Sequence, residues 1–363
     1  MRTEPNPTNR GAAREVTLVI PARDAARTIE PCLDAALAVA ARPGSRLARI
    51  LLVDDGSRDA TREAAVARGI EVLESGGRGA GAARNVGWRA ATTELVWFVD
   101  SDCVAAPDAL EILLPHLADP AVGGVGGSYA IAPDATLLER LIHEEIVTRH
   151  ARMEGDVDFL ATFNVLYRRD ALAALEGFDE RYLKGQDAEF AFRVLESGRR
   201  LRFDRGSLVR HFHADRLSKY LRVQRQQGYW RVALHLEHRG HGAGDSYSGL
   251  LDHLQPFAAA ALAPAVLAAV AAPLAGARGA ALAAALAPFA ILLAFLLAAQ
   301  LPMARAMARR EGAAMLWFVP LGAVRAVWRA AGLVHGVVDR TLGRGAIAAR
   351  SLARRQAEGN AAP

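Results

Sequence analysis

The feature that most constrains this chain is a run of five apolar residues, Leu95–Val99, which stops abruptly at Asp100 and Asp102. Such a run predicts a strand buried on both faces, as in a parallel sheet. Ligands of these sheets bind beyond the carboxyl ends of the strands. If the chain stays extended, acids two positions apart point the same way, so we expect Asp100 and Asp102 to share one Mg²⁺ or Mn²⁺. A solvated turn is the alternative, because this spacing recurs widely by chance.

The first 120 residues repeat a short apolar run followed by a helical segment. The apolar runs are 16–20, 50–53, 70–73 and 95–99, and the helical segments are 25–40, 59–68, a stretch ending near Ala91, and 107–117. Strands and helices in alternation predict an α/β fold, with a parallel sheet covered on both faces. The polar residues that follow each strand therefore collect at one edge of the sheet.

Composition divides the 363 residues into a polar first part and an apolar, basic last part. We expect a lead-in at 1–14 without signal peptide or anchor, an α/β domain at 15–238 with halves 15–118 and 119–238, a linker at 239–255, a membrane region at 256–340 and a basic tail at 341–363. Ten arginines against three acids from Arg305 onward place the positive charge in the tail, so we expect no nucleic-acid partner. Two distant cysteines suit a reducing compartment.

Two segments, 257–275 and 280–301, contain no charged residue and are each long enough to cross a hydrocarbon core of about 30 Å. Much of their apolarity is alanine, so a buried hairpin of a soluble protein is the alternative. Basic residues after the hairpin favour the cytoplasmic side, which places the α/β domain at the cytoplasmic face of the inner membrane. We expect a third segment, 313–338, to lie in the interface, with Arg325 and Arg329 gripping anionic lipids; a third span is the alternative.

Six segments of the chain, taken together and in this order, resemble the family 2 glycosyltransferases that have the GT-A fold. They are VIPARDAARTIEPCLDAAL, LLVDDGSRDAT, GAGAARNVGWRAA, FVDSDC, GFDERYLKGQDAEFAFRV and the HFH at 211–213. Any one of them is a weak signal, and the resemblance runs from about Thr17 to Trp230. It implies a Rossmann-like, mostly parallel sheet, a nucleotide-sugar donor and a divalent cation, Mg²⁺ or Mn²⁺.

For the donor, the resemblance places the nucleobase and ribose at the ends of the first two strands. The residues it implies there are Pro21, Ala22, Arg23, Asp54 and Asp55. A carboxylate at this place can accept from a uracil N–H, which favours a UDP-sugar. Arg23 stands where the family commonly has an aromatic residue, and a turn with a helix cap would also explain the two acids.

The resemblance implies that the donor's diphosphate contacts Arg84, Asn85, Asp100 and Ser101. Arg84 and Asn85 begin a helix after a glycine-rich stretch, and both a helix start and an arginine favour phosphate oxygens. An ion pair with a neighbouring acid would also explain Arg84.

The metal ligands implied by the resemblance are Asp100, Asp102 and His211, and the ion would stabilise the departing nucleotide. A structural role is the alternative for His211. Asp187 corresponds to the base that takes the acceptor's proton, with Gln186 in place of the usual preceding acid; helix capping is the alternative for Asp187. Attack opposite the leaving group would invert the anomeric carbon.

Three residues are expected near the acceptor: Asn164, Gln186 and Trp230, although packing explains Asn164 and Trp230 equally well. The QQGYW at 226–230 resembles the QxxRW motif of processive synthases, with Tyr229 in place of arginine and too few spans after it for a polymer channel. We therefore expect a single sugar to be transferred to a lipid-linked or cell-envelope glycan acceptor. The alternatives are a processive polysaccharide synthase, a non-catalytic membrane partner and a nucleotidyltransferase.

Overall fold

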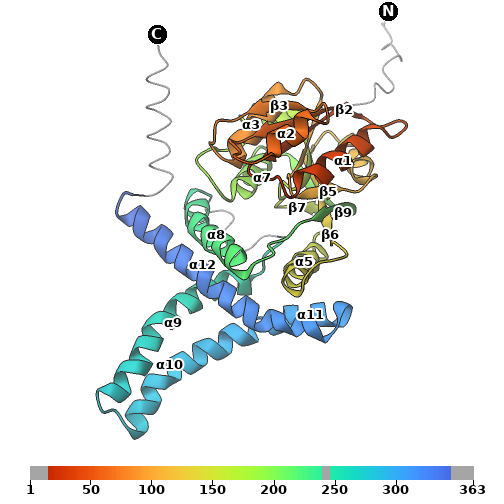
Figure 1. Ribbon diagram of the computed structural model, residues 1–363. Coiled ribbons are helices and arrows are strands. Elements are labelled where there is room, and N and C mark those ends of the chain that lie inside the picture. Colours follow the sequence, from red (N-terminus) through yellow and green to blue (C-terminus); the bar gives the residue numbers. More distant parts are fainter. Residues whose placement is uncertain (1–14, 239–245, 345–363) are drawn as a thin grey trace, which may run out of the picture.

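The computed structural model describes residues 15–238 and 246–344. The expected lead-in lies outside the described residues, as do most of the expected tail and part of the linker. In Figure 1 an α/β domain forms one end of the molecule, and a group of long helices forms the other.

One mixed sheet forms the centre of the α/β domain. Its strands are β1 Val16–Ala22, β2 Leu47–Asp54, β3 Glu71–Glu74, β4 Leu95–Val99, β5 Cys103–Ala105, β6 Val122–Ala130, β7 Gly155–Val157, β8 Asn164–Arg168 and β9 Arg200–His211. They run in the order β3-β2-β1-β4-β8-β6-β9-β5, with β7 beside β9. The first four strands are parallel, whereas β8 is antiparallel to both β4 and β6. The expected α/β fold with a mostly parallel sheet is confirmed.

Strand β4 is buried on both faces, as its apolar run predicts. Leu95, Trp97 and Val99 pack into one layer of the core. Val96 and Phe98 pack into the other layer. Because successive side chains of a strand point to opposite faces, a central strand with helices on both sides needs an unbroken apolar run.

Eight helices accompany the sheet in the described residues. They are α1 Ile29–Ala40, α2 Thr61–Val66, α3 Ala80–Ala90, α4 Ala109–Leu113, α5 Leu137–His150, α6 Arg169–Ala174, α7 Gln186–Glu196 and α8 Leu217–Glu237. The segment expected as one helix at 107–117 is α4 followed by a 3₁₀ turn, Leu114–Ala118. Helix α5 begins with a capping box, in which Thr136 and Glu139 satisfy each other's backbone N–H groups.

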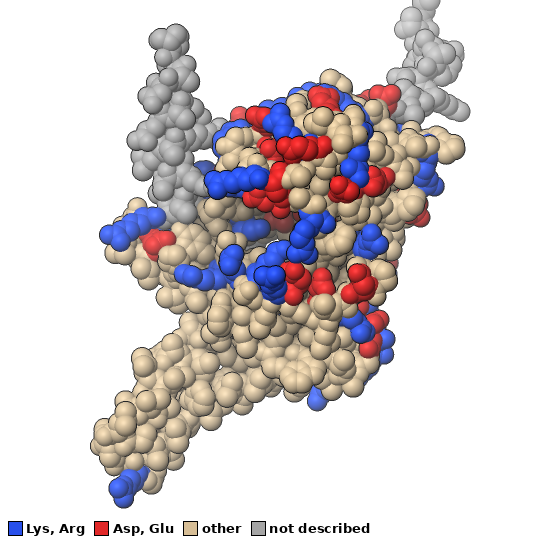
Figure 2. Space-filling view, viewed as in Figure 1, with Lys and Arg blue, Asp and Glu red and all other residues tan. Residues whose placement is uncertain are grey.

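The remaining helices are α9 Leu250–Leu274, α10 Gly279–Ala298, α11 Leu301–Glu311 and α12 Phe318–Thr341. Within the described residues, α9 and the stretch of α10 and α11 are long and apolar enough to cross a membrane, and few of their residues are buried. Helices α9 and α10 form a hairpin that projects away from the sheet (Figure 1). Figure 2 shows almost no charge on it, since Arg278 is the only charged residue from 257 to 301. This exposure favours contact with lipid over the soluble alternative, because a soluble hairpin would be buried.

The arginines of α12 do not face lipid headgroups as expected. Arg325 is buried and forms an ion pair with Glu145 of α5. The Nε of Arg329 donates to Oε1 of Gln224 in α8 at 2.7 Å. A charged group in an apolar setting is costly unless it is paired, and here the partners come from the α/β domain. Trp328 and Val334 of α12 are exposed, so an interfacial position for this helix stays a prediction.

Glycines allow α12 to pack closely along α8. A Cβ at Gly332 would overlap the carbonyl oxygen of Arg225, and a Cβ at Gly228 would overlap the carbonyl oxygen of Arg329. Each helix therefore places a glycine against the backbone of the other. Such close approach without a side chain between the backbones is what small residues at a helix interface permit.

We predict that Gly332→Leu separates α12 from α8. Overpacking costs about 1–3 kcal/mol, which exceeds the gain of up to about 1 kcal/mol in helix propensity on replacing glycine. Thermal unfolding of the purified full chain in detergent should show a lower Tm, and trypsin should cleave α12 faster. Ala331→Leu, at the exposed neighbouring position, is the control and should behave as the wild type. Equal behaviour of the two variants would contradict the close packing.

Candidate active site

The carboxyl ends of β1, β2 and β4 meet at one edge of the sheet. Ala22 of β1 pairs with Asp54 of β2, and Val19 of β1 pairs with Phe98 of β4, both in parallel register. The segments that follow these three strands therefore lie side by side, as the alternation of strands and helices predicts.

Asp55 joins the loops at this edge. Its Oδ1 accepts from Oγ of Ser75 at 2.6 Å, and its Oδ2 accepts from the backbone N–H of Gly79 at 2.9 Å. Its own N–H donates to the carbonyl of Ala22 at 2.8 Å. The guanidinium of Arg23 lies 3.6 Å from Oδ2 and is about half exposed. Asp55 thus orders the glycine-rich loop, and Arg23 is the side chain that faces solvent.

Asp54 and Pro21 are buried at this edge of the sheet and contact neighbouring parts of the protein. Oδ1 of Asp54 accepts from the backbone N–H of Ser57 at 3.1 Å, which is the turn contact named as the alternative. Pro21 is buried in β1 beside Val53. Contact of these residues with a nucleobase stays a prediction.

Arg84 lies in the second turn of α3, and it is buried and only partly paired. The expected start of this helix at Arg84 is wrong, because α3 begins at Ala80. Nη2 of Arg84 donates to Oδ1 of Asp100 at 2.6 Å. Its Nε and Nη1 are also buried and have no hydrogen-bond partner in the described part of the chain. Buried polar groups are normally satisfied, and a guanidinium is a common partner of phosphate groups. The ion-pair alternative is therefore correct for Nη2, while Nε and Nη1, on different edges of the guanidinium, each have an open N–H group. The expected contact with the diphosphate stays a prediction.

The chain does not stay extended after β4, so the expected extended tip is wrong. The N–H of Cys103 donates to the carbonyl of Asp100 at 2.9 Å, which closes a turn over Ser101 and Asp102. The carboxylate of Asp100 accepts from Arg84. A cation shared by Asp100 and Asp102 stays a prediction.

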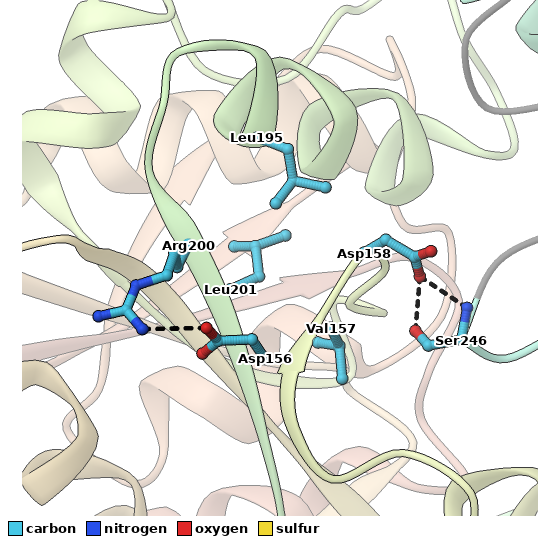
Figure 3. A pocket seen from close by; sticks show the side chains of 7 residues that line it. All are labelled: Asp156, Val157, Asp158, Leu195, Arg200, Leu201 and Ser246. Carbon is cyan, nitrogen blue, oxygen red and sulfur yellow. Dashed lines mark hydrogen bonds and ion pairs between the residues drawn. The ribbon is translucent and has the colours of Figure 1, made fainter.

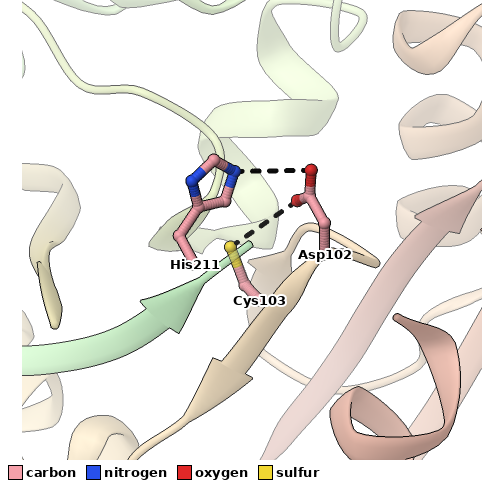
Figure 4. Close-up of side chains that lie close together, drawn as sticks. All are labelled: Asp102, Cys103 and His211. Carbon is pink, nitrogen blue, oxygen red and sulfur yellow. Dashed lines mark hydrogen bonds and ion pairs between the residues drawn. The ribbon is translucent and has the colours of Figure 1, made fainter. Parts of the chain in front are cut away.

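Asp102 instead lies beside His211 at the end of β9 (Figure 4). Its Oδ2 is 3.3 Å from Nε2 of His211. Cys103 pairs directly with His211 across β5 and β9, so their side chains share one face of the sheet. One ligand atom from each of Asp102, Cys103 and His211 lies within 4.8 Å of the others. Two of the three expected metal ligands are thus brought together, and Asp100 is not among them.

The donor set of this cluster fits Mg²⁺ or Mn²⁺ through a carboxylate and an imidazole. Burial alone would raise the pKa of Asp102. The opposite effect of the neighbouring His211 prevails, so the pKa lies below its ordinary value and the carboxylate is ionised. Burial raises the pKa of Cys103, so its thiol stays neutral and is a weak ligand. Sequence reasoning missed Cys103, although its position directly after Asp102 was the available signal.

Asp187 lies at the start of α7, where Gly185 turns the chain into the helix with φ of +83°. Its Oδ1 accepts from the N–H of Ala188 at 2.9 Å. Burial raises the pKa of Asp187; the cation of Arg84 lowers it and the carboxylate of Asp100 raises it. Both groups are near enough to act on Asp187, so the expected base lies in the same neighbourhood as the expected diphosphate contacts.

Gln186 precedes Asp187 and lies against the start of α3. A Cβ at Gly81 would be 3.8 Å from the side chain of Gln186. Oε1 of Gln186 is buried without a hydrogen-bond partner among the described residues. Like Nε and Nη1 of Arg84, this oxygen is a buried polar atom beside the site without a hydrogen-bond partner among the described residues.

Asn85 and Asn164 are buried amides of the core rather than exposed ligand contacts. Nδ2 of Asn85 donates to the carbonyl of Phe178 at 2.8 Å, and its Oδ1 accepts the N–H of Phe178 at 2.8 Å. Oδ1 of Asn164 accepts from Nε1 of Trp97 at 2.9 Å, and its Nδ2 donates to Oγ of Ser207 at 3.0 Å. The packing alternative given for Asn164 agrees with these hydrogen bonds, and the amide of Asn85 is also satisfied inside the protein.

Trp230 is also a core residue. It is buried in a cluster with Tyr182 and Phe192, and its ring centroid lies 5.8 Å from that of Tyr182. The expected acceptor contact of Trp230 is therefore replaced by the packing of α8 against α7 and the loop before it.

A pocket of about 260 Å³ lies away from this site (Figure 3). Its lining residues are Asp156, Val157, Asp158, Leu195, Arg200, Leu201 and Ser246. Arg200 begins β9, whereas His211 ends it. The charged side chains that line the pocket already have partners within the protein. Nη1 of Arg200 donates to Asp156 at 3.0 Å, and Asp158 accepts from Ser246 at 2.6 Å.

Comparison with known proteins identifies the α/β domain. Residues 17–175 match the family described as Glycosyl transferase family 2. This part of the chain belongs to the family 2 glycosyltransferases. The GT-A fold expected from the resemblance is confirmed, and the glycosyltransferase domain carries the edge of the sheet described above.

Two of the curated relatives that resemble this chain have names that describe glycosyltransferases. The Pre-mycofactocin glycosyltransferase of Mycobacterium tuberculosis is 29% identical over 236 aligned positions, and the match covers 60% of this chain and 47% of the relative. Glycosyltransferase AglE of Haloferax volcanii is 27% identical over 205 aligned positions, and the match covers 52% of this chain and 64% of the relative. The chain therefore spans about half of the mycobacterial protein and under two thirds of the archaeal one.

One solved structure resembles nearly the whole chain. It is the mannosyltransferase PcManGT of Pyrobaculum calidifontis in complex with GDP-Man and Mn²⁺, with a TM-score of 0.54 and 21% identity. The similarity covers 93% of this chain and 90% of that chain. At this identity the likeness establishes the fold alone.

We predict that Asp102→Asn and His211→Ala each weaken Mn²⁺ binding roughly 10- to 100-fold, the range known for disturbed metal sites. Binding can be measured from the electron paramagnetic resonance signal of free Mn²⁺. Cys103→Ser should keep nearly the wild-type affinity, because the neutral thiol is a weak ligand. A larger loss in the Cys103 variant than in the His211 variant would reverse this assignment.

Proposed function

We propose that the protein is a metal-dependent inverting glycosyltransferase that moves a sugar from a UDP-sugar to a lipid-linked or cell-envelope glycan acceptor at the cytoplasmic face of the membrane. The observation that carries this proposal is the buried guanidinium of Arg84. It has two open donors, and it lies beside Asp100 and near Asp187. A diphosphate and a base for the acceptor are the two requirements that these groups meet.

The donor's diphosphate would accept from an open N–H group of Arg84, at Nε or at Nη1. Asp102 and His211 would hold a divalent cation, which when bound supplies Lewis-acid stabilisation of the departing nucleoside diphosphate. Asp100 would keep the guanidinium of Arg84 oriented through its 2.6 Å hydrogen bond. A fixed cation at the place where negative charge develops costs no reorganisation during the reaction.

Asp187 would act as the general base. The acceptor oxygen forms a bond to the anomeric carbon, the bond from that carbon to the diphosphate oxygen breaks, and the acceptor's proton passes to the carboxylate of Asp187. Burial raises the pKa of Asp187 above its ordinary value, which moves it toward the working pH and improves proton transfer. Attack from the face opposite the leaving group gives inversion.

The C-terminal helices support an acceptor at a membrane surface. The hairpin of α9 and α10 is exposed and apolar, and α11 after it carries Arg305, Arg309 and Arg310, a composition typical of the cytoplasmic side. The names of the relatives above give no shared acceptor, so the acceptor is proposed by class alone.

The alternative of a processive synthase is disfavoured by the position of the QQGYW segment. Gly228 packs against α12, and the hydroxyl of Tyr229 donates to Oδ2 of Asp339 at 3.0 Å. These residues join two helices, and the neighbouring Trp230 is buried. This use of the segment supports transfer of a single sugar.

The transfer assay tests the proposal directly. Membranes that contain the full chain should incorporate label from a UDP-sugar into the lipid extract or glycan in the presence of Mn²⁺, with GDP-mannose as a competing donor. Asp187→Asn should lower the rate roughly 10²- to 10⁴-fold, the usual contribution of a general base. Asp156→Asn is the matched control, because Asp156 lies in β7, beside the start of β9 and away from the site. No transfer from any nucleotide sugar, or full activity of the Asp187 variant, would overturn the proposal.

The pH dependence gives a separate prediction. Asp187 must be ionised to act as a base, so kcat/KM should fall as the pH drops through its raised pKa, above the ordinary value of 3.8. Arg84 lowers this pKa, so Arg84→Gln should move the acid limb to higher pH as well as slowing the reaction. Arg78→Gln, at an exposed arginine of the preceding loop, should leave the limb in place. A limb that moves to lower pH in the Arg84 variant would refute the assignment.

A further inference from the structure

His211 has a second contact on the side of its ring that faces away from Asp102. Its Nδ1 lies 2.8 Å from Nδ1 of His213. Nε2 of His213 in turn lies 3.3 Å from Nδ1 of His143, which belongs to α5. His143 and His213 are both buried. Three histidines from two elements thus form a chain that begins at the metal site.

The protonation of the two inner rings follows from their two nitrogen–nitrogen contacts. At each contact one nitrogen must donate a hydrogen bond and the other must accept it. A ring nitrogen that accepts carries no proton, so a ring with one accepting nitrogen is neutral. A neutral imidazole has one N–H donor and one nitrogen that accepts.

With neutral rings, metal binding at His211 allows only one order of donors along the chain. If Nε2 of His211 binds the ion, its proton is on Nδ1 and must be donated to Nδ1 of His213. The proton of His213 is then on Nε2 and must be donated to Nδ1 of His143. The proton of His143 is on Nε2, on the side of Glu144, whose Oε1 lies 4.0 Å away.

We propose that His143 is a positioning residue of the metal site, which accepts the N–H of His213 and so fixes the tautomer and orientation of His211. This inference rests on the metal site of the proposed function. Ligating histidines commonly donate their second N–H to a fixed partner, which orients the ring and raises its basicity. Here that partner is a histidine, and it needs a second histidine to have its own tautomer fixed.

The surroundings hold the three rings in place. The ring of Tyr129 is tilted against that of His211, with 4.8 Å between the ring centroids, and meets that of His213 edge to face at 5.7 Å. Helix α5 is itself anchored, because Glu144 forms an ion pair with Arg310 of α11 at 3.3 Å. The acceptor nitrogen of His143 is therefore presented from a fixed backbone.

The test measures Mn²⁺ binding to the full-length protein in detergent by electron paramagnetic resonance. His143→Phe keeps a ring but removes the acceptor, and should weaken Mn²⁺ binding roughly 10- to 100-fold. His143→Asn places an amide oxygen near the former Nδ1 and should restore most of the affinity. In a His211→Ala background, His143→Phe should cause no further loss, because the effect passes through His211.

The matched control is His150→Asn. His150 is a buried histidine of the same helix, and its Nδ1 is hydrogen-bonded to Oγ of Ser128 at 2.9 Å, outside the chain of three. This variant should bind Mn²⁺ as the wild type does. If it weakens binding as much as His143→Phe, or if the losses in the His143 and His211 variants add, the role of His143 is merely structural and the inference fails.

Mn²⁺ binding and sugar transfer by the wild type show whether a negative result concerns the positioning role of His143 or the proposed function itself. If the wild type binds Mn²⁺ and transfers sugar, but His143→Phe is unchanged in Mn²⁺ affinity, only the positioning role is wrong. If the wild type binds no Mn²⁺, the metal site is wrong and the inference falls with it. Should His143→Phe have a reduced Tm, the comparison of His143→Asn with His143→Leu decides the question, since these side chains have similar size and only the first can accept a hydrogen bond.

Discussion

The site depends on the parallel pairing of β4 with β1. The register aligns Val19 with Phe98, and both core layers are filled by alternate side chains of β4. A slip by one residue would turn Trp97 and Phe98 to the wrong faces, so the register is strongly specified. Asp100 is therefore forced to leave the sheet at the edge where α3 begins, and this is why Arg84 meets it. Burial of an apolar strand thus fixes the position of a charged pair.

The parts of the fold that depend on local sequence were predicted well, and those that depend on distant partners were not. Strand β4 has the expected bounds, because its apolar run and the acids after it are adjacent in sequence. Strand β5 was missed, since its three residues are held by pairing with β9, more than 100 residues away. The turn at Asp100 and the meeting of Cys103 with His211 follow from that pairing.

Polar residues were hardest to assign, because a buried amide and a ligand contact require the same side chain. Asn164 matched a position near the acceptor in the resemblance, yet its partners Trp97 and Ser207 come from other strands. Arg325 was expected at lipid headgroups for its charge, and its actual partner Glu145 lies 180 residues away. In each case the residue that pairs with the polar side chain is distant in sequence, so neither motif spacing nor composition can predict the contact.

Helix α5 connects the two halves of the molecule through three consecutive residues. His143 faces the metal site, Glu144 pairs with Arg310, and Glu145 pairs with Arg325. Replacing a buried ion pair by apolar residues is often neutral or stabilising, whereas removing one partner costs about 3–5 kcal/mol. Stability alone therefore does not explain these charges. They permit few alternative positions of α11 and α12 against α5, because any displacement leaves a carboxylate buried and unpaired. If the hairpin lies in a membrane, the same helix sets the distance from that membrane to the edge of the sheet where the sugar would be transferred.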